Sequence, residues 1–255
     1  MNYLPINDAT IRYTLLDGDP ARPYLVFLHE GLGCIEMWKD FPELLCNKTH
    51  CPGLLYDRSG YGQSSPLRKK RDINYVHDYA LRELPGVIQG VIPGKPFILI
   101  GHSDGASIGL IFGSEKSKLL RGIVTEAAHV FLEPKTIQGI RIADDVYERE
   151  GAKGLEKYHA DNTHNIFKAW SDTWLSTWFK DWNIESLLPS ISCPLLVIQG
   201  SDDAYGTDKQ VEAIISQVSG PVTSHIISNC GHAPHLECPE AVLGIMQEFI
   251  GKLQY

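Results

Sequence analysis

Six short blocks of aliphatic and β-branched residues recur along the chain, and segments of helical length separate them. The blocks are "PYLVFLH" (23–29), "GLLYD" (53–57), "PFILIGH" (96–102), "RGIVTEA" (121–127), "PLLVIQG" (194–200) and "VTSHIIS" (222–228). Continuous apolar runs, unlike alternating ones, are typical of strands buried on both faces of a parallel sheet. The pattern therefore predicts an α/β fold, with a mostly parallel sheet between two layers of helices.

Two further segments depart from this rhythm. "ATIRYTLLDGD" (9–19) alternates more strictly and ends in a glycine turn, which predicts a half-exposed, antiparallel strand at the sheet edge. Residues 133–190 hold no strand-like block, only helical segments separated by Gly, Pro and Asn. We therefore expect 1–132 and 191–255 to form one α/β core, and 133–190 to form a helical insertion.

Four tryptophans stand four residues apart within the predicted insertion: Trp170, Trp174, Trp178 and Trp182. On one helix, successive steps of four residues drift by about 40°, so the indoles would form a slanting stripe. Such a stripe can pack the insertion onto the body, or some of its rings can line a ligand cavity. The two interpretations are compatible, and both remain open at this point.

The charge composition of the chain argues against some classes of binding partner. The 23 basic and 31 acidic residues give a formal charge of −8, which argues against nucleic acid or an anionic membrane as the main partner. The basic run "RKKR" (68–71) reads as a solvated loop. No signal peptide or bilayer-length apolar run is visible, and six cysteines without a CxxC pattern are typical of reduced thiols. We expect a cytoplasmic monomer or homodimer that acts on a small molecule.

A serine stands between two of the apolar elements, in "GHSDG" (101–105). The pentapeptide fits Gly-x-Ser-x-Gly, and its flanking glycines permit a tight strand-to-helix turn where a Cβ would clash with backbone. This turn presents the Ser103 hydroxyl outward and leaves the Asp104 amide unpaired at a helix N-terminus, where negative charge is favoured. The context favours a nucleophile over the alternative, a turn serine that caps a helix.

A serine hydroxyl needs a base to take its proton. His232, in "SNCGHAPHLECPE", follows the last apolar block, which predicts a loop at the C-terminal edge of the sheet. His235 is interpreted as a helix-start or surface residue. Although "HAPH" could suggest two metal ligands, no third ligand is spaced to join them, so no metal is expected.

A carboxylate must orient the imidazole, and "VIQGSDDAYG" supplies two at the end of a predicted strand. The spacing from the strand end favours Asp203, whereas Asp202 is interpreted as a turn neighbour. Glu126, just past another strand, is the more distant rival. The order Ser103, Asp203, His232 is the chain order of a nucleophile-elbow hydrolase.

The loop "FLHEGLGC" (27–34) supplies a candidate for the second oxyanion donor. Its glycines allow a backbone amide to approach a ligand closely, and the N–H of Gly31 is the candidate, with Glu30 as the alternative. Asp104 supplies the first donor. Because neither GxGxxG nor GxxxxGK[ST] occurs, the loop does not predict a nucleotide site, and no cofactor is expected.

Taken together, these segments resemble the α/β-hydrolase superfamily, nearly from end to end. "LHEGLG" resembles its oxyanion loop, with Glu30 where glycine is usual, and "YDRSGYGQS" (56–64) resembles the segment after its fourth strand. "GHSDG", "GSDD" and "CGHAPHLE" match the elbow, the acid loop and the histidine loop. The resemblance implies an eight-stranded, mostly parallel sheet, with 133–190 as a cap inserted after the sixth strand.

The resemblance also implies the chemistry. Related dehalogenases and epoxide hydrolases attack with an aspartate at the elbow, whereas this chain has serine, so we expect a capped serine esterase, a carboxylesterase of small acyl esters. Carbon–carbon bond hydrolysis or perhydrolysis by the same triad is the alternative, and a ligand receptor without turnover is the rival from another class. His129, Trp174 and Trp178 are candidates for contact with substrate. His29 and His102 are expected to be hydrogen-bonded scaffold.

Overall fold

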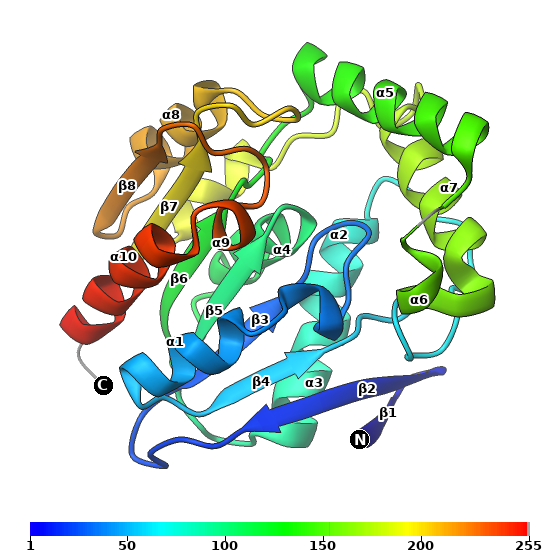
Figure 1. Ribbon diagram of the computed structural model, residues 1–255. Coiled ribbons are helices and arrows are strands. Elements are labelled where there is room, and N and C mark those ends of the chain that lie inside the picture. The colour runs from blue at the N-terminus through cyan, green and yellow to red at the C-terminus, as the bar shows by residue number, and fades with distance from the viewer. Residues whose placement is uncertain (153, 254–255) are drawn as a thin grey trace.

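The computed structural model describes residues 1–152 and 154–253, which form an eight-stranded sheet with helices on both faces (Figure 1). The strands are ordered β1-β2-β4-β3-β5-β6-β7-β8. β2 is antiparallel to both of its neighbours, and the remaining neighbouring pairs are parallel. The α/β class and the mostly parallel eight-stranded sheet are confirmed.

Each apolar block of the sequence forms a strand. The strands are β1 (Asn2–Ile6), β2 (Ala9–Leu16), β3 (Tyr24–Leu28), β4 (Gly53–Tyr56), β5 (Phe97–His102), β6 (Leu120–Glu126), β7 (Leu195–Gly200) and β8 (Val222–Ile227). The helices of the body are η1 (Ile35–Trp38), α1 (Phe41–Thr49), α2 (Tyr75–Asp78), η2 (Tyr79–Glu83), α3 (Leu84–Val91), α4 (Asp104–Gly113), α8 (Asp208–Gln217), α9 (Pro234–Glu237) and α10 (Pro239–Lys252).

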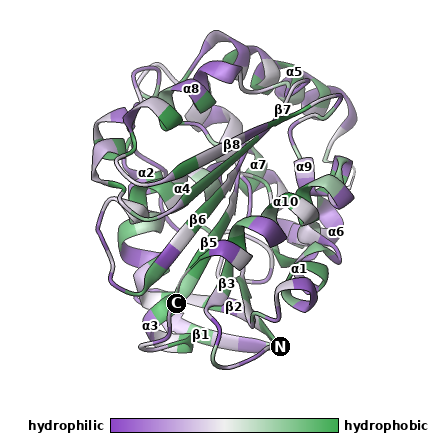
Figure 2. Ribbon diagram, turned by 90° about the vertical axis from the view of Figure 1, so that its left-hand side faces the viewer, coloured by the Kyte–Doolittle hydropathy of each residue, from purple (hydrophilic) through white to green (hydrophobic). Residues whose placement is uncertain are grey.

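The central strands are apolar on both faces because each face packs against helices. Along β3, Leu25 and Phe27 belong to one core with α1 and α10, whereas Val26 and Leu28 belong to the core on the opposite face. Figure 2 shows the consequence, since the central strands are mainly hydrophobic while α8 and α10 mix hydrophobic and hydrophilic residues. For this reason, the sequences of the central strands are continuously apolar and do not alternate between apolar and polar residues.

The N-terminal edge differs from the expectation in one respect. The strand predicted within 9–19 is antiparallel as β2, but it lies second from the edge, since β1 pairs along its other side. β1 was not predicted, because its sequence "NYLPI" is mostly exposed and contains Pro5. Proline is tolerated at a sheet edge, where one side of the strand needs no partner.

The segment between β6 and β7 is helical. It contains α5 (Pro134–Glu150), α6 (Glu156–His159), η3 (Ala160–Asn162), α7 (Thr163–Trp174) and η4 (Glu185–Ser190). Figure 1 shows α5, α6 and α7 gathered at the upper right, beyond the strands. We call α5, α6, η3 and α7 the cap helices; the predicted ranges 133–190 and 191–255 also include 153 and 254–255, which lie outside the described residues.

The tryptophan spacing does not correspond to one helical stripe. α7 ends at Trp174, so only Trp170 and Trp174 share a helix, and both are buried. Beyond it the chain turns. The Trp182 ring stacks on that of Phe179, with 5.4 Å between their centroids, and its centroid lies 5.5 Å from that of Trp174. Trp178 is 46% exposed.

Within the described part of the chain, no helix is long and apolar enough to cross a membrane.

Candidate active site

Ser103 lies on a sharp turn between β5 and α4. Its backbone has φ 52° and ψ −116°, in the region that L-residues rarely adopt. A side chain at Gly101 would overlap the backbone of Gly105 and Ala106, and one at Gly105 would overlap the carbonyl of Leu28 in β3. Both glycines are therefore required by close approach of backbone, and the strained turn is the nucleophile-elbow geometry expected from the sequence.

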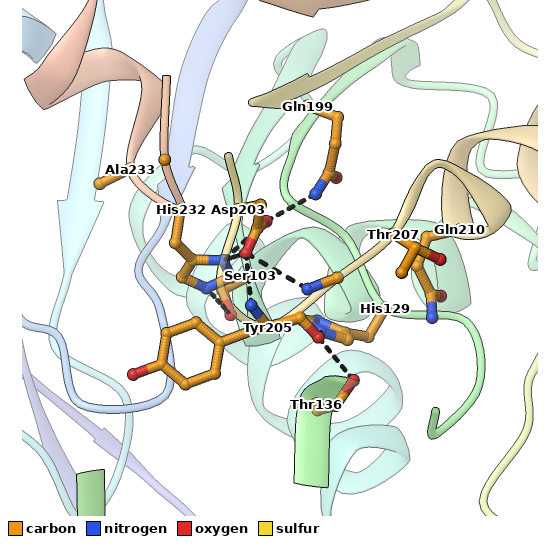
Figure 3. Close-up of polar contacts among 12 residues, drawn as sticks. Ser103, His129, Thr136, Gln199, Asp203, Tyr205, Thr207, Gln210, His232 and Ala233 are labelled. Atoms are coloured by element: carbon orange, nitrogen blue, oxygen red, sulfur yellow. Dashed lines mark hydrogen bonds and ion pairs between the residues drawn. The ribbon is translucent and has the colours of Figure 1, made fainter. Parts of the chain in front are cut away.

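The three predicted triad residues meet at the carboxyl ends of β5, β7 and β8 (Figure 3). His232 Nε2 lies 3.0 Å from Ser103 Oγ, and His232 Nδ1 lies 2.9 Å from both carboxylate oxygens of Asp203. Because Asp203 only accepts, Nδ1 carries the proton, which leaves Nε2 as the acceptor for the serine hydroxyl. The geometry places the predicted nucleophile, base and orienting acid in one hydrogen-bonded chain.

The carboxylate of Asp203 accepts three hydrogen bonds besides its contacts with His232. Its Oδ1 accepts the backbone N–H groups of Tyr205 at 2.7 Å and Gly206 at 3.2 Å, and its Oδ2 accepts Gln199 Nε2 at 2.5 Å. Burial alone would raise the pKa of Asp203, but the hydrogen bond and charge of His232 outweigh it and lower the pKa to about 2. The carboxylate is thus ionised and fixed in orientation at neutral pH.

The rival acids have other partners. Glu126 Oε2 accepts the backbone N–H of His235 at 2.9 Å and lies 3.2 Å from its Nδ1. Asp202 is exposed and accepts the hydroxyl of Ser201. His235 lies in the first turn of α9, in agreement with the helix-start interpretation, but the surface interpretation is wrong because the residue is buried against Trp38 and Phe41.

Two backbone amides are available for an oxyanion. In the described residues, neither the N–H of Gly31 nor that of Asp104 has a hydrogen-bond acceptor, and the two residues are adjacent, since a Cβ on Gly31 would contact Asp104 Cγ at 3.4 Å. Asp104 is the first residue of α4, where free N–H groups and the helix dipole favour negative charge.

Glu30, the alternative donor, is tied to the scaffold by its side chain. Its carboxylate lies 3.6 Å from His102 Nδ1. Burial opposes ionisation, but the ion pair with His102 outweighs it and lowers the pKa of Glu30 to about 2. Burial likewise opposes the charged form of His102, and the charge of Glu30 outweighs it, so the pKa of His102 is raised. His102 Nε2 in turn donates to the carbonyl of His232 at 2.7 Å, so this ion pair supports the loop that carries the base.

The predicted oxyanion loop rests on two buried side chains. His29 Nδ1 donates to the carbonyl of Glu30 at 2.9 Å, and its Nε2 accepts the backbone N–H of Arg58 at 3.1 Å. The Arg58 guanidinium, fully buried, donates to the carbonyls of His29 and Glu30, both at 2.8 Å. His29 and His102 are thus hydrogen-bonded scaffold, as the sequence indicated.

A cavity of about 310 Å³ opens above Ser103, between the body and the cap helices. Its walls are mainly apolar and include Trp170 and Trp174 of α7 and Ile140 of α5. His129 also lines it, with its ring 5.4 Å from Trp174 and 6.0 Å from His232. Of the three predicted pocket residues, His129 and Trp174 face the cavity, whereas Trp178 is half-exposed and does not line it.

Several supporting residues carry no sequence motif. Gln199 could have been found as a polar residue inside the apolar block "PLLVIQG", but nothing in the sequence marks Tyr75 or His159. His159 of α6 accepts the N–H of Gly62 at 3.0 Å and donates to the carbonyl of Leu32 at 2.9 Å. It joins a cap helix to the predicted oxyanion loop.

The basic run also differs from its interpretation as solvated throughout. Arg71 is partly buried, its guanidinium 4.5 Å from the ring centroid of Tyr75 and hydrogen-bonded to the hydroxyl of Tyr61. The three residues before it, at 68–70, are exposed, as predicted.

One group of potential metal ligands lies away from the triad. Among the described residues, Cys34, Glu36 and Asp57 place ligand atoms within 4.8 Å of one another. Arg12 already contacts Glu36 at 2.5 Å and Asp57 at 3.2 Å. Its guanidinium supplies the positive charge that a metal ion would bring, so the group is an ion-pair cluster in which Arg12 and Asp57 are buried and Glu36 is partly exposed.

A family model and a curated relative each match most of this chain. A sequence model described as "Alpha/beta hydrolase family" matches residues 25–245. Protein ABHD8 of Bos taurus is 23% identical over 264 residues, an alignment that covers 95% of this chain but 59% of that protein. The chain thus spans about three fifths of the length of that relative.

Two further alignments cover nearly the full length of both proteins compared. The 2-succinyl-6-hydroxy-2,4-cyclohexadiene-1-carboxylate synthase of Enterobacter sp. (strain 638) is 22% identical, with 91% of this chain and 93% of that protein aligned. The crystal structure of CarC, a serine hydrolase involved in carbazole degradation, superposes with a TM-score of 0.78 at 18% identity, covering 98% of each chain.

Proposed function

Because this chain belongs to the alpha/beta hydrolase family, we propose that it is a serine hydrolase that cleaves small-molecule carboxylic esters through a covalent acyl-enzyme. One observation carries the proposal: Ser103 Oγ, His232 and Asp203 are joined by hydrogen bonds of 2.9 to 3.0 Å, and Ser103 and His232 line a cavity. Family membership alone would not suffice, since related folds host many functions.

The chemistry follows from the roles of these groups. Ser103 Oγ attacks the ester carbonyl carbon while His232 Nε2 takes the hydroxyl proton, and Asp203 stabilises the imidazolium that forms. The amides of Gly31 and Asp104 receive the negative charge that develops on the carbonyl oxygen. His232 then gives its proton to the departing alcohol, which leaves an acyl group on Ser103.

A water molecule completes the cycle. His232 removes a proton from water, the resulting nucleophile attacks the acyl-enzyme carbonyl, and collapse of the intermediate returns the proton to Ser103 and releases the carboxylic acid. The cavity of about 310 Å³ lies at the small end of the range for ligand sites, and its walls are mainly apolar. This size supports a short acyl or alcohol group.

The test is covalent labelling followed by turnover. A fluorophosphonate should modify the protein at Ser103, and the Ser103→Ala variant should lose both the label and hydrolysis of p-nitrophenyl acetate and butyrate. Ser216→Ala is the matched control, because Ser216 is an exposed serine in α8 that bonds only to its own helix. A folded protein that leaves Ser103 unlabelled and cleaves no ester would overturn the proposal.

A further inference from the structure

His129 stands in the cavity wall in a way that the triad chemistry does not use. It follows β6, and its side chain is 3% exposed. The backbone of His129 is fixed, because its N–H and its carbonyl both bond to the Ser107 hydroxyl, at 3.3 and 2.6 Å. The ring is placed by its contacts with Trp174 and His232, between the cap and the catalytic base.

The hydrogen bond of the ring determines its tautomer. His129 Nε2 lies 3.2 Å from the backbone carbonyl of Tyr205. A carbonyl oxygen only accepts, so Nε2 must carry the proton. Burial, together with the charge of His232, lowers the pKa of His129, so the ring is neutral. The second nitrogen, Nδ1, is therefore a lone-pair acceptor.

That acceptor has no partner in the protein. No residue that the structure describes donates a hydrogen bond to His129 Nδ1, although the side chain lines the cavity. The cavity walls are mainly apolar and include Trp170, Trp174 and Ile140. A molecule bound in the cavity, or the water that it displaces, can therefore supply the donor.

We propose that His129 is a specificity-determining residue that selects substrates carrying a hydroxyl or N–H donor in the part that fills the cavity. This inference rests on the proposed function and deepens it, because it names the class of ester. An apolar substrate would displace water and leave Nδ1 buried without a donor, which is costly. A substrate with a hydrogen-bond donor satisfies Nδ1. Sites that hydrogen-bond a group of the substrate discriminate strongly against analogues without that group.

The kinetic test uses matched esters. Ethyl butyrate is compared with ethyl 2-, 3- and 4-hydroxybutyrate, and propyl butyrate with 3-hydroxypropyl butyrate, so that hydroxyls on both sides of the ester are sampled. We expect at least one hydroxylated member to exceed its parent in kcat/KM by about tenfold or more. If every hydroxylated ester is cleaved no faster than its parent, the inference is wrong.

Two variants assign the selectivity to Nδ1. His129→Phe keeps a ring of similar size but no acceptor, and the Tyr205 carbonyl stays satisfied because Thr136 Oγ1 also donates to it at 2.6 Å. We expect its hydroxyl preference to fall to within about twofold of unity. His129→Asn retains an acceptor near the position of Nδ1 and should keep part of the preference. A preference that survives in His129→Phe overturns the assignment.

A binding measurement separates this inference from the proposed function. In Ser103→Ala, which cannot form an acyl-enzyme, the same esters are titrated while the fluorescence of the cavity tryptophans is followed. Tighter binding of a hydroxylated ester, lost in Ser103→Ala/His129→Phe, supports the inference even if the protein proves to be a receptor. Equal binding of both esters contradicts it even if the protein proves to be an esterase.

Discussion

Tyr75 donates its hydroxyl hydrogen to the carboxylate of Asp104, with 3.2 Å between the oxygens. The same hydroxyl accepts Trp174 Nε1 at 2.8 Å. Trp174 ends α7, and Asp104 directly follows Ser103 in the chain. A chain of two hydrogen bonds therefore links a cap helix to the elbow, and all three side chains are buried.

Tyr75→Phe should destabilise the protein. The change leaves the Trp174 indole N–H without its acceptor and removes a donor from the Asp104 carboxylate, at little cost in volume. A buried group left unsatisfied costs about 1–3 kcal/mol, so the loss at the Trp174 N–H alone should lower the free energy of unfolding in urea by about that amount. The control is Tyr3→Phe on β1, where the ring is 50% exposed and the change should have little effect.

Gln199→Leu should slow turnover without comparable loss of substrate binding. Gln199 fixes one carboxylate oxygen of Asp203, which must hold the imidazole of His232 in line. A hydrogen bond to a charged group contributes about 1.5–3 kcal/mol, so kcat should fall by about tenfold or more. KM should change little, because Gln199 does not line the cavity. An unchanged kcat would show that the backbone N–H groups alone orient Asp203.

Glu83 should make stability depend on pH. Burial raises the pKa of Glu83 from 4.5 to about 7, and one of its oxygens has no partner among the described residues. Between these two values the folded state binds more protons than the unfolded state, so stability falls as pH rises from about 4.5 to about 7. Below that window the penalty is absent, and above it the penalty is complete.

Glu83→Gln removes this titration while keeping an acceptor for the N–H of Ser59, which bonds to Glu83 at 3.0 Å. We expect the variant to match the natural protein near pH 4 and to be more stable by about 1–3 kcal/mol at pH 8, measured by urea unfolding. The exposed Glu115→Gln change serves as the control. A difference that does not grow with pH would contradict the assignment.

The parts of the site that were predictable from sequence are those attached to strand ends. Ser103, Asp203 and His232 follow apolar blocks, and parallel strands deliver their carboxyl ends to one edge, so chain position alone brings them together. Trp178 was misplaced because four-residue spacing predicts a face only while the helix continues, and α7 ends at Trp174. Contacts between the cap and the body depend on packing, which no local pattern encodes.

His159 is such a contact, and it predicts a coupling between the cap and catalysis. Its ring Nε2–H donates to the carbonyl of Leu32, one residue beyond the proposed oxyanion donor Gly31. Its Nδ1 accepts the N–H of Gly62. Both nitrogens are used by backbone groups of the body, so the cap side chain fixes the loop whose amide is the proposed oxyanion donor.

His159→Ala should therefore lower kcat more than it raises KM, because a loosened amide weakens binding of the transition state more than binding of the ester. Losing one oxyanion donor costs about 10²–10³ in kcat, and a mispositioned donor should cost part of that, about tenfold. The matched control is His164→Ala, an exposed cap histidine that bonds to Tyr147 within the cap. If both variants lose activity equally, or if His159→Ala changes only KM, the cap holds substrate and does not position the oxyanion loop.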